Sequence, residues 1–198
     1  MRQLLLQHAL LTADFMVGME LSCRDNLFLK LISTDELPLP ETTRLPLQWN
    51  VTVKSGAKFG VIPDAVFALQ WLHTSDQQND TLYFVEADRG TMPITRRNPK
   101  QSSFFRKLLA YQQSWTQGVV QERFGQRRFR VLTITSTKQR REHLMQACAE
   151  LKTGKGLFLF TDQETLRATP NTLLLPWFTA DGAIETLAEP APVRARAT

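Results

Sequence analysis

Three carboxylates stand in two hydrophobic stretches of the chain, at a spacing that could bring them together. Asp64 follows Pro63, and Glu86 and Asp88 belong to the run 83–88. Side chains alternate between the two faces of a strand, so Glu86 and Asp88 project to the same side. Carboxylates crowded in a half-buried place repel one another and are costly to desolvate, so they need a cation or basic side chains beside them. The alternative is that all three face solvent at strand ends.

Positive charge is concentrated in the segment that follows these acids. From Arg89 to Arg141 there are thirteen Lys or Arg residues and one acid, so the segment carries +12 while the whole chain carries +5. A basic segment beside an acidic cluster suits a protein that holds a polyanion by its phosphates and places metal ions against it. We therefore expect DNA as the partner. The alternative is a basic surface that serves only solubility. The candidate DNA contacts are Arg89, Arg96, Arg97, Lys100, Arg106, Arg127 and Arg128.

The first half of the chain has the pattern of a helix followed by strands. Apolar residues at helical spacing predict a helix over 2–21. Hydrophobic runs predict strands over 26–33, 59–69 and 82–88, and a further short strand could lie within 47–54. Prolines at 38, 40 and 46 predict a loop over 34–50. The polar stretch His73–Thr81 predicts a tight return, which would place Asp64, in mid-strand, beside Glu86.

Helices and strands alternate in the second half. Ser102 or Ser103 can cap a helix over 102–115, in which Phe104, Leu108, Tyr111 and Trp115 form a stripe that can pack on a sheet. We then expect a strand over 127–136, a helix over 138–151 and a strand over 156–161. The segment 162–188 suggests a short helix, an irregular excursion at Pro176-Trp177 and a last strand after Asp181-Gly182. The predicted fold class is α/β, with a central mixed sheet flanked by helices.

Composition supports one domain of ordinary size. The chain has 198 residues, 42% of them hydrophobic, which is enough for one substantial core. We expect that domain over 1–188 and a flexible tail over 189–198. Cys23 and Cys148 show no disulfide or metal-ligand spacing, no leader segment precedes the first helical pattern, and no apolar run reaches the ~18 residues of a membrane span. We expect a soluble, cytoplasmic protein.

The order of helix, three strands, helix and strand is similar to the core of the PD-(D/E)XK nuclease-like superfamily. Pro63-Asp64 matches its first motif and Glu86 the acid of its second. Within that superfamily, the segments PDAVFAL, YFVEADRGTMP, RKLLAYQQSW and FRVLTIT resemble the replication-relaxation family of plasmids and other mobile elements, over residues 3–178. The resemblance implies a DNA-directed protein that acts in replication or mobilisation. It also implies a winged-helix or other partner protein, since family members commonly carry an amino-terminal winged-helix module. A homo-oligomer is a further expectation.

The chain departs from the superfamily at position 88, where Asp stands in place of the lysine that would steady an attacking water. If the site is catalytic, Asp64 and Glu86 bind Mg²⁺ or Mn²⁺ with Asp88 as a third ligand, and the cation activates water against a phosphodiester. Lys107 on the following helix could then supply the missing positive charge. If the site is not catalytic, the fold serves as a scaffold that binds DNA or a protein partner in replication or transcription control.

Overall fold

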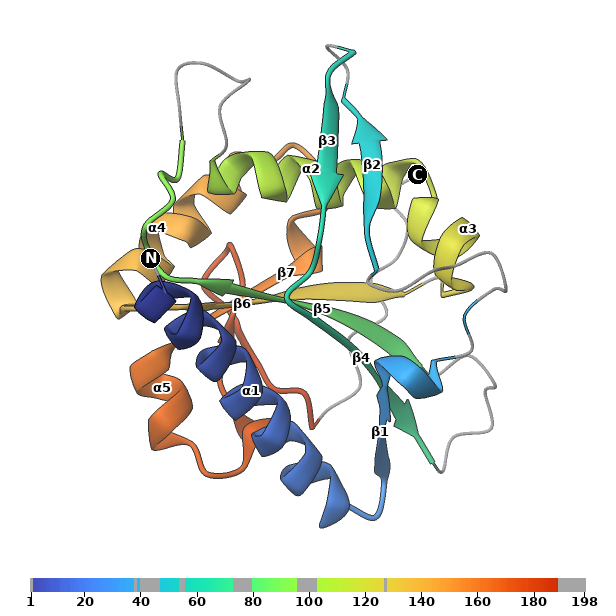
Figure 1. The fold of residues 1–198 in the computed structure, drawn as a ribbon, viewed down its shortest axis with the longest axis vertical. Helices are drawn as coiled ribbons and strands as arrows, with labels where there is room; N and C mark the ends of the chain where they lie inside the picture. Colours follow the sequence, from blue (N-terminus) through green and yellow to red (C-terminus); the bar gives the residue numbers. More distant parts are fainter. Residues whose placement is uncertain are drawn as a thin grey trace.

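Helices lie on both faces of one mixed β-sheet, and a two-stranded hairpin stands against one of those faces (Figure 1). The computed structural model of the chain describes residues 2–37, 39, 47–53, 56–72, 80–95, 103–126 and 128–188. Within them the helices are α1 (Arg2–Arg24), α2 (Phe104–Thr116), α3 (Val119–Phe124), α4 (Lys138–Ala149) and α5 (Gln163–Ala168). The 3-10 turns are η1 (Thr34–Glu36), η2 (Lys155–Leu157) and η3 (Thr172–Leu174). The strands are β1 (Leu29–Ser33), β2 (Trp49–Thr52), β3 (Lys58–Val61), β4 (Ala65–Trp71), β5 (Thr81–Asp88), β6 (Phe129–Thr135), β7 (Phe158–Asp162), β8 (Trp177–Phe178) and β9 (Ile184–Glu185).

The strands follow the order β1-β4-β5-β6-β7-β8-β9 across the large sheet. β4 and β5 form the antiparallel hairpin that the sequence predicts, with Ala65 opposite Val85. β5, β6 and β7 are parallel, and their last residues, Asp88, Thr135 and Asp162, are register partners. The carboxyl ends of these three strands therefore meet at one edge of the sheet, which we call the carboxyl edge.

Alternation along β5 assigns its side chains to two hydrophobic layers. Phe84 faces α2, where its ring lies 5.7 Å from that of Tyr111. Tyr83 faces the opposite layer, which includes Phe15 of α1. Because side chains alternate with a period of two, Glu86 follows Phe84 and faces α2. The polar end of β5 is thus buried beneath a helix, although strand ends usually reach water.

Helix α2 begins where the sequence predicts a cap. Ser103 Oγ accepts a hydrogen bond from the backbone N–H of Arg106 at 3.3 Å, which satisfies one of the otherwise unpaired amide groups at the helix start. Leu108 and Tyr111 are buried against the sheet as expected, but Trp115 is 46% exposed. The predicted apolar stripe is correct over its first two turns, and its last member lies at the surface.

The predicted strand over 59–69 is wrong as one element. Its first part is β3, which pairs with β2, and its second part is β4, which pairs with β1 and β5. The break falls at 62–64, where Pro63 has no N–H to offer to a ladder. Asp64 therefore lies at the entrance to β4 and not in mid-strand, and its backbone N–H donates to the carbonyl of Val85 at 2.9 Å.

Three smaller differences concern element boundaries and short elements. α1 continues to Arg24, beyond the predicted end at 21. The helix α3 was not anticipated, because it has only six residues between two glycines in the left-handed conformation. The excursion predicted at Pro176-Trp177 contains the short strand β8, in which Phe178 pairs with Phe160 of β7. A two-residue strand beside a proline has no sequence pattern of its own, so only its pairing with β7 makes this segment a strand.

The polar return over 73–79 and the tail over 189–198 lie outside the described residues. Among the described helices, none combines the length and the apolar character that a bilayer span requires.

Candidate functional site

Glu86 is the centre of the candidate site. It lies on β5 beneath α2 and is only 2% exposed. Two side chains of α2, four residues apart and therefore on one face of that helix, reach its carboxylate. Tyr111 donates its hydroxyl to Oε1 at 2.7 Å, and the Lys107 ammonium donates to Oε2. The buried carboxylate thus has a protein donor on each oxygen.

Burial and charge oppose each other in this ion pair. Burial raises the pKa of the Glu86 carboxyl, and the Lys107 ammonium lowers it by less. Burial alone would lower the pKa of Lys107, but the carboxylates of Glu86, Asp64 and Asp88 together raise it by more. The pKa of Tyr111 is raised well above its usual value, by burial first and by Glu86 second. Lys107 therefore stays charged, and Tyr111 stays a neutral donor.

Asp88 is held by helix α4. Arg140 donates its Nε to Oδ2 of Asp88 at 2.9 Å and its Nη2 to Oδ1 at 3.2 Å, which is the two-pronged geometry that guanidinium groups make with carboxylates. Thr135 of β6 donates its hydroxyl to the same Oδ2 at 2.8 Å. The Arg140 guanidinium also donates to the carbonyl of Met92 at 2.5 Å, which ties the segment after β5 to α4.

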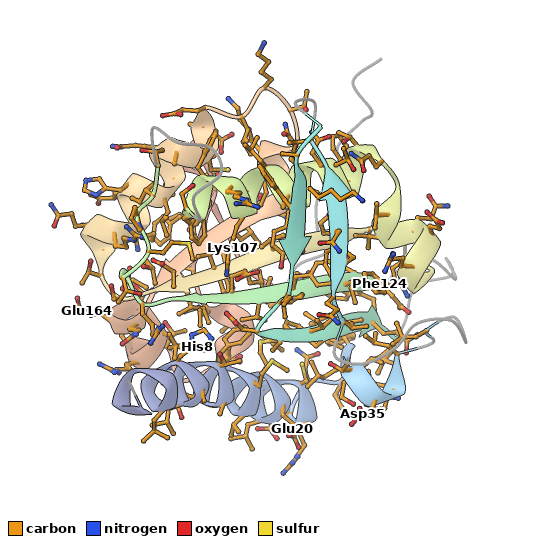
Figure 2. All side chains as sticks on the ribbon, turned by 45° about the horizontal axis from the view of Figure 1, so that its top comes forward. His8, Glu20, Asp35, Lys107, Phe124 and Glu164 are labelled. Atoms are coloured by element: carbon orange, nitrogen blue, oxygen red, sulfur yellow. The ribbon has the colours of Figure 1, made fainter. Side chains whose placement is uncertain are left out.

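Asp64 links the acidic cluster to helix α1. Its Oδ1 lies 2.9 Å from Nε2 of His8, and its Oδ2 accepts the backbone N–H of Ala87 at 2.8 Å. Figure 2 shows His8 on the side of α1 that faces the sheet. The charge of Asp64 raises the pKa of Glu86, so the two acids are electrostatic neighbours. The hairpin therefore brings Asp64, Glu86 and Asp88 around Lys107, and each acid takes partners from a different helix.

The carboxylate oxygens that a divalent cation would need are all engaged by protein donors. Both carboxylate oxygens of Asp64, Glu86 and Asp88 already accept hydrogen bonds from protein donors. Two of these donors are the permanent cations Lys107 and Arg140, which repel a metal ion at the same oxygens. In the described part of the chain, no three His, Cys, Asp or Glu side chains are grouped so that they could hold a metal.

Part of the basic segment lies inside the protein. Of its thirteen cations, Lys107, Arg130, Arg140 and Arg141 form ion pairs with acids that lie outside the segment. Arg141 is buried, with its Nη1 2.6 Å from Oδ2 of Asp162 and its guanidinium 3.7 Å from the Phe178 ring centroid. When these four acidic partners are counted with the segment, its net charge falls from +12 to +8. The sequence overstated the positive charge that faces solvent, because internal ion pairs use the same residue types as a DNA-binding surface.

The predicted DNA contacts fall into three groups. Arg106 lies over the Phe59 ring at 4.1 Å, and Arg128 is exposed. Arg89 is turned away from Lys107 and lines a cleft of 620 Å³ between α1 and α5, together with Ser136 and Arg167. The remaining candidates lie outside the described residues: Arg96, Arg97, Lys100 and Arg127.

Sequence reasoning missed two residues of the cluster. His8 is a single polar residue in the first helical pattern, and Arg140 is one cation among thirteen in the basic segment. Each lies more than fifty positions along the chain from the acid it contacts, His8 from Asp64 and Arg140 from Asp88. No local spacing could reveal either contact. Lys107 and Tyr111 did carry a local signal, since they share one face of a helix directly after the acidic strand.

Comparison with curated proteins and with solved structures gives no match. A model of the replication-relaxation family matches residues 3–127, which is more than half of the chain. The match covers α1, β4, β5 and α2, so it includes Asp64, Glu86, Asp88 and Lys107. It confirms the resemblance to the replication-relaxation family over residues 3–127 of the predicted 3–178, and it suggests a role in the replication or mobilisation of a plasmid or mobile element. The chain belongs to the replication-relaxation family.

Proposed function

We propose that this protein is a DNA-binding module for the replication or mobilisation of a plasmid or mobile element, and that it binds DNA without cutting it. The observation that carries the proposal is the neutralised acidic cluster, in which Lys107 and Arg140 occupy the carboxylates that a nuclease would use for metal. Buried carboxylates with these partners contribute to the native structure and leave the surrounding surface for binding.

The topology supports a nuclease-like ancestry for the module. The order α1, β1, β4, β5, α2, β6 follows the helix, three strands, helix and strand of the PD-(D/E)XK core. Asp64 precedes the second of these strands, and Glu86 lies near the end of the third. In this proposal the site has kept its acids and has gained Asp88 where a lysine would serve catalysis. The metal site at Asp64, Glu86 and Asp88 stays a prediction, which the cleavage assay below decides.

Covalent strand cleavage by a tyrosine is also disfavoured. The chain has two tyrosines. Tyr83 and Tyr111 are both buried, and burial raises the pKa of each above its usual value. A tyrosine that attacks a phosphodiester must reach the DNA and lose its proton. Neither phenol meets these requirements in this fold.

The DNA surface we propose lies on the α2 side of the sheet. It includes Arg106 and the exposed Lys58, whose carbonyl accepts from the Arg106 guanidinium at 3.4 Å. Arg128 and Lys138 are exposed elsewhere in the same basic segment. In this proposal the cations contact phosphates, so they position the DNA and do not read its sequence. A winged-helix partner would supply the sequence preference.

Binding of a fluorescent DNA duplex, measured by anisotropy over a series of salt concentrations, tests the proposal. The affinity should fall steeply as salt rises, because neutralised phosphates release counterions. Arg106→Ala, which removes a cation of the proposed surface, should weaken binding and lower the salt slope by about one. Arg24→Ala is the matched control, since Arg24 is exposed but lies on α1, outside the basic segment. A salt-independent affinity, or equal effects of both variants, would argue against the proposed surface.

Incubation with supercoiled plasmid and Mg²⁺ or Mn²⁺ tests the second half of the proposal. We expect no nicking by the wild-type protein. Nicking that disappears in Glu86→Gln, at unchanged DNA affinity, would overturn the non-catalytic assignment and establish the metal site. Nicking that persists in Glu86→Gln would indicate a contaminating nuclease.

A further inference from the structure

A cleft lies at the carboxyl edge, on the face of the sheet opposite α2. Asp88 ends β5 facing α4, where Arg140 holds it, and alternation turns the next residue to the other face. The residues that follow β5, β6 and β7 are Arg89, Ser136 and Gln163, and all three line the cleft of 620 Å³ between α1 and α5. Figure 1 shows both of these helices on the side of the sheet away from α2. We call this cavity the edge cleft.

Contacts between α1 and the segment after α5 fix the walls of the edge cleft. Ser22 Oγ accepts the backbone N–H of Thr172 at 2.9 Å, and a Cβ at Gly18 would lie 2.4 Å from Oγ1 of Thr172. Leu11 and Leu166 pack in one hydrophobic layer beneath the sheet. Segments that are distant in the chain thus enclose one cavity. Open α/β sheets bind their ligands outside the carboxyl ends of parallel strands, which is where the edge cleft lies.

The lining of the edge cleft combines two guanidinium groups with apolar walls. Arg89 is half-buried at the end of β5, and Arg167 is exposed on α5. Guanidinium groups bind phosphate oxygens through paired N–H donors. Leu10, Leu166 and Pro170 supply apolar surface around them, which can cover a ring. This combination fits a ligand that carries both a phosphate group and a flat ring.

The size of the edge cleft and its remaining charge narrow the class of ligand. Its volume of 620 Å³ lies within the range of about 300–1,000 Å³ for small-molecule sites. A phosphate ion, a few times the ~30 Å³ of a water molecule, would leave most of it empty. Asp14 also lines the cleft, so two arginines and one acid give its lining a net charge of +1. A carboxylate accepts N–H and O–H donors, which a nucleotide offers on its base and sugar.

We propose that the edge cleft binds a nucleotide 5′-monophosphate, with the phosphate at Arg89 and Arg167 and the base against the apolar walls. The 5′-phosphorylated end of a DNA strand and a free nucleotide share this chemistry. A phosphate inside a strand carries one negative charge, whereas a terminal monoester carries about 1.5 to 2 at neutral pH, so the two arginines favour the terminal group. The assignment does not rest on the proposed DNA surface, which lies on the α2 side of the sheet.

Fluorescence anisotropy of the full chain with a tetranucleotide labelled at its 3′ end tests the proposal. The 5′-phosphorylated tetranucleotide should bind at least about tenfold more tightly than the same tetranucleotide with a 5′-hydroxyl, because charged hydrogen bonds to the monoester are lost without the phosphate. Arg167→Ala should reduce the affinity for the phosphorylated form by about tenfold. Arg24→Ala, which removes an exposed arginine of α1 outside the edge cleft, should not.

A charge placed in the wall provides a second, independent variant. Leu10 is 50% exposed, so Leu10→Glu should fold, and its carboxylate should abolish the preference for the 5′-phosphate by repulsion. Leu21→Glu is the matched control, since Leu21 is 51% exposed on the same helix. It lies about 16 Å further along α1, beyond the Debye length of about 8 Å at physiological salt. Circular dichroism should show that both variants are folded.

Competition with deoxyadenosine 5′-monophosphate separates the two sources of the phosphate. Displacement of the labelled tetranucleotide by this nucleotide, but not by deoxyadenosine, would show that the edge cleft takes free nucleotides. A 5′-phosphate preference that persists without such displacement would show that it takes the end of a DNA strand.

Equal binding of the two tetranucleotides, or no binding of either, would overturn the proposal. A preference that Leu10→Glu and Arg167→Ala both leave unchanged would also overturn it, because the phosphate would then bind elsewhere. Arg106→Ala should leave the preference intact, so a failure of the edge cleft and a failure of the DNA surface on the α2 side are separate results.

Discussion

The ion pair beneath α2 allows a prediction that depends on pH. Glu86 has 3% of its side chain exposed and Lys107 has 37%. Removing one partner of a fully buried pair costs about 3–5 kcal/mol, because it leaves an uncompensated charge. Since Lys107 is partly solvated, we expect a smaller loss for Lys107→Ala, about 2–3 kcal/mol at pH 8. Lys138→Ala, which removes an exposed lysine from α4, should change the free energy of unfolding by less than about 0.5 kcal/mol.

The sign of the pH effect follows from Glu86. Burial already raises its pKa in the folded protein, and the loss of Lys107 should raise that pKa further. An acid whose folded pKa lies above its unfolded value of 4.5 contributes stability at low pH that is lost as the pH rises toward the folded pKa. The variant loses stability over a wider pH window than the wild type. The difference between them should therefore be small near the unfolded pKa of 4.5 and should grow as the pH rises above it.

Urea denaturation followed by tryptophan fluorescence at pH 5 and pH 8 measures this difference. The double variant Lys107→Ala/Glu86→Gln has no buried charge at this position, so its stability relative to the wild type should change less with pH than that of Lys107→Ala. A pH-independent loss in Lys107→Ala, or a loss no larger than that of Lys138→Ala, would refute the view that Lys107 neutralises a buried carboxylate.

Three further predictions concern the tyrosines, the α1 contact and the second buried ion pair. Burial raises the pKa of Tyr83 to about 12, and that of Tyr111 is also well above 10, so tyrosinate absorbance should stay absent past pH 10. As the pH rises from 10 to 12, the free energy of unfolding should fall by about 3 kcal/mol through Tyr83 alone, because its phenol ionises there only in the unfolded protein. A Tyr83 phenol that titrates near pH 10 in the folded protein would contradict this prediction. A Cβ at Gly18 would lie 2.4 Å from Oγ1 of Thr172, so Gly18→Ala should lower the unfolding midpoint and Thr172→Ala should reverse that loss. Arg141→Ala should lower the free energy of unfolding in urea by about 3–5 kcal/mol, because it leaves the buried carboxylate of Asp162 without its cationic partner. A loss below about 0.5 kcal/mol, as is usual for an exposed residue, would show that the ion pair does not stabilise the fold.

Local spacing in the sequence determined which side chains share a face. The period of two along β5 places Glu86 and Asp88 together, and the helical period along α2 places Lys107 beside Tyr111. The hairpin of β4 and β5 was also predictable, because a short polar return joins two hydrophobic runs. These inferences need only the geometry of one element or of two neighbouring elements, and they recovered the α/β architecture. The family came from the resemblance of whole segments, which the family model supports over residues 3–127.

Only the tertiary structure decided which charge meets which. His8 reaches Asp64 and Arg140 reaches Asp88 through the packing of α1 and α4 against opposite faces of the sheet. An arginine that binds phosphate and an arginine that neutralises a buried acid have the same chemistry, so the sequence counted both as surface charge. In the same way, Phe15 and Val17 are both apolar residues of α1, but Phe15 faces the core and Val17 faces solvent. Sequence periodicity reports that a residue is charged or apolar, but its environment depends on residues that are distant in the chain.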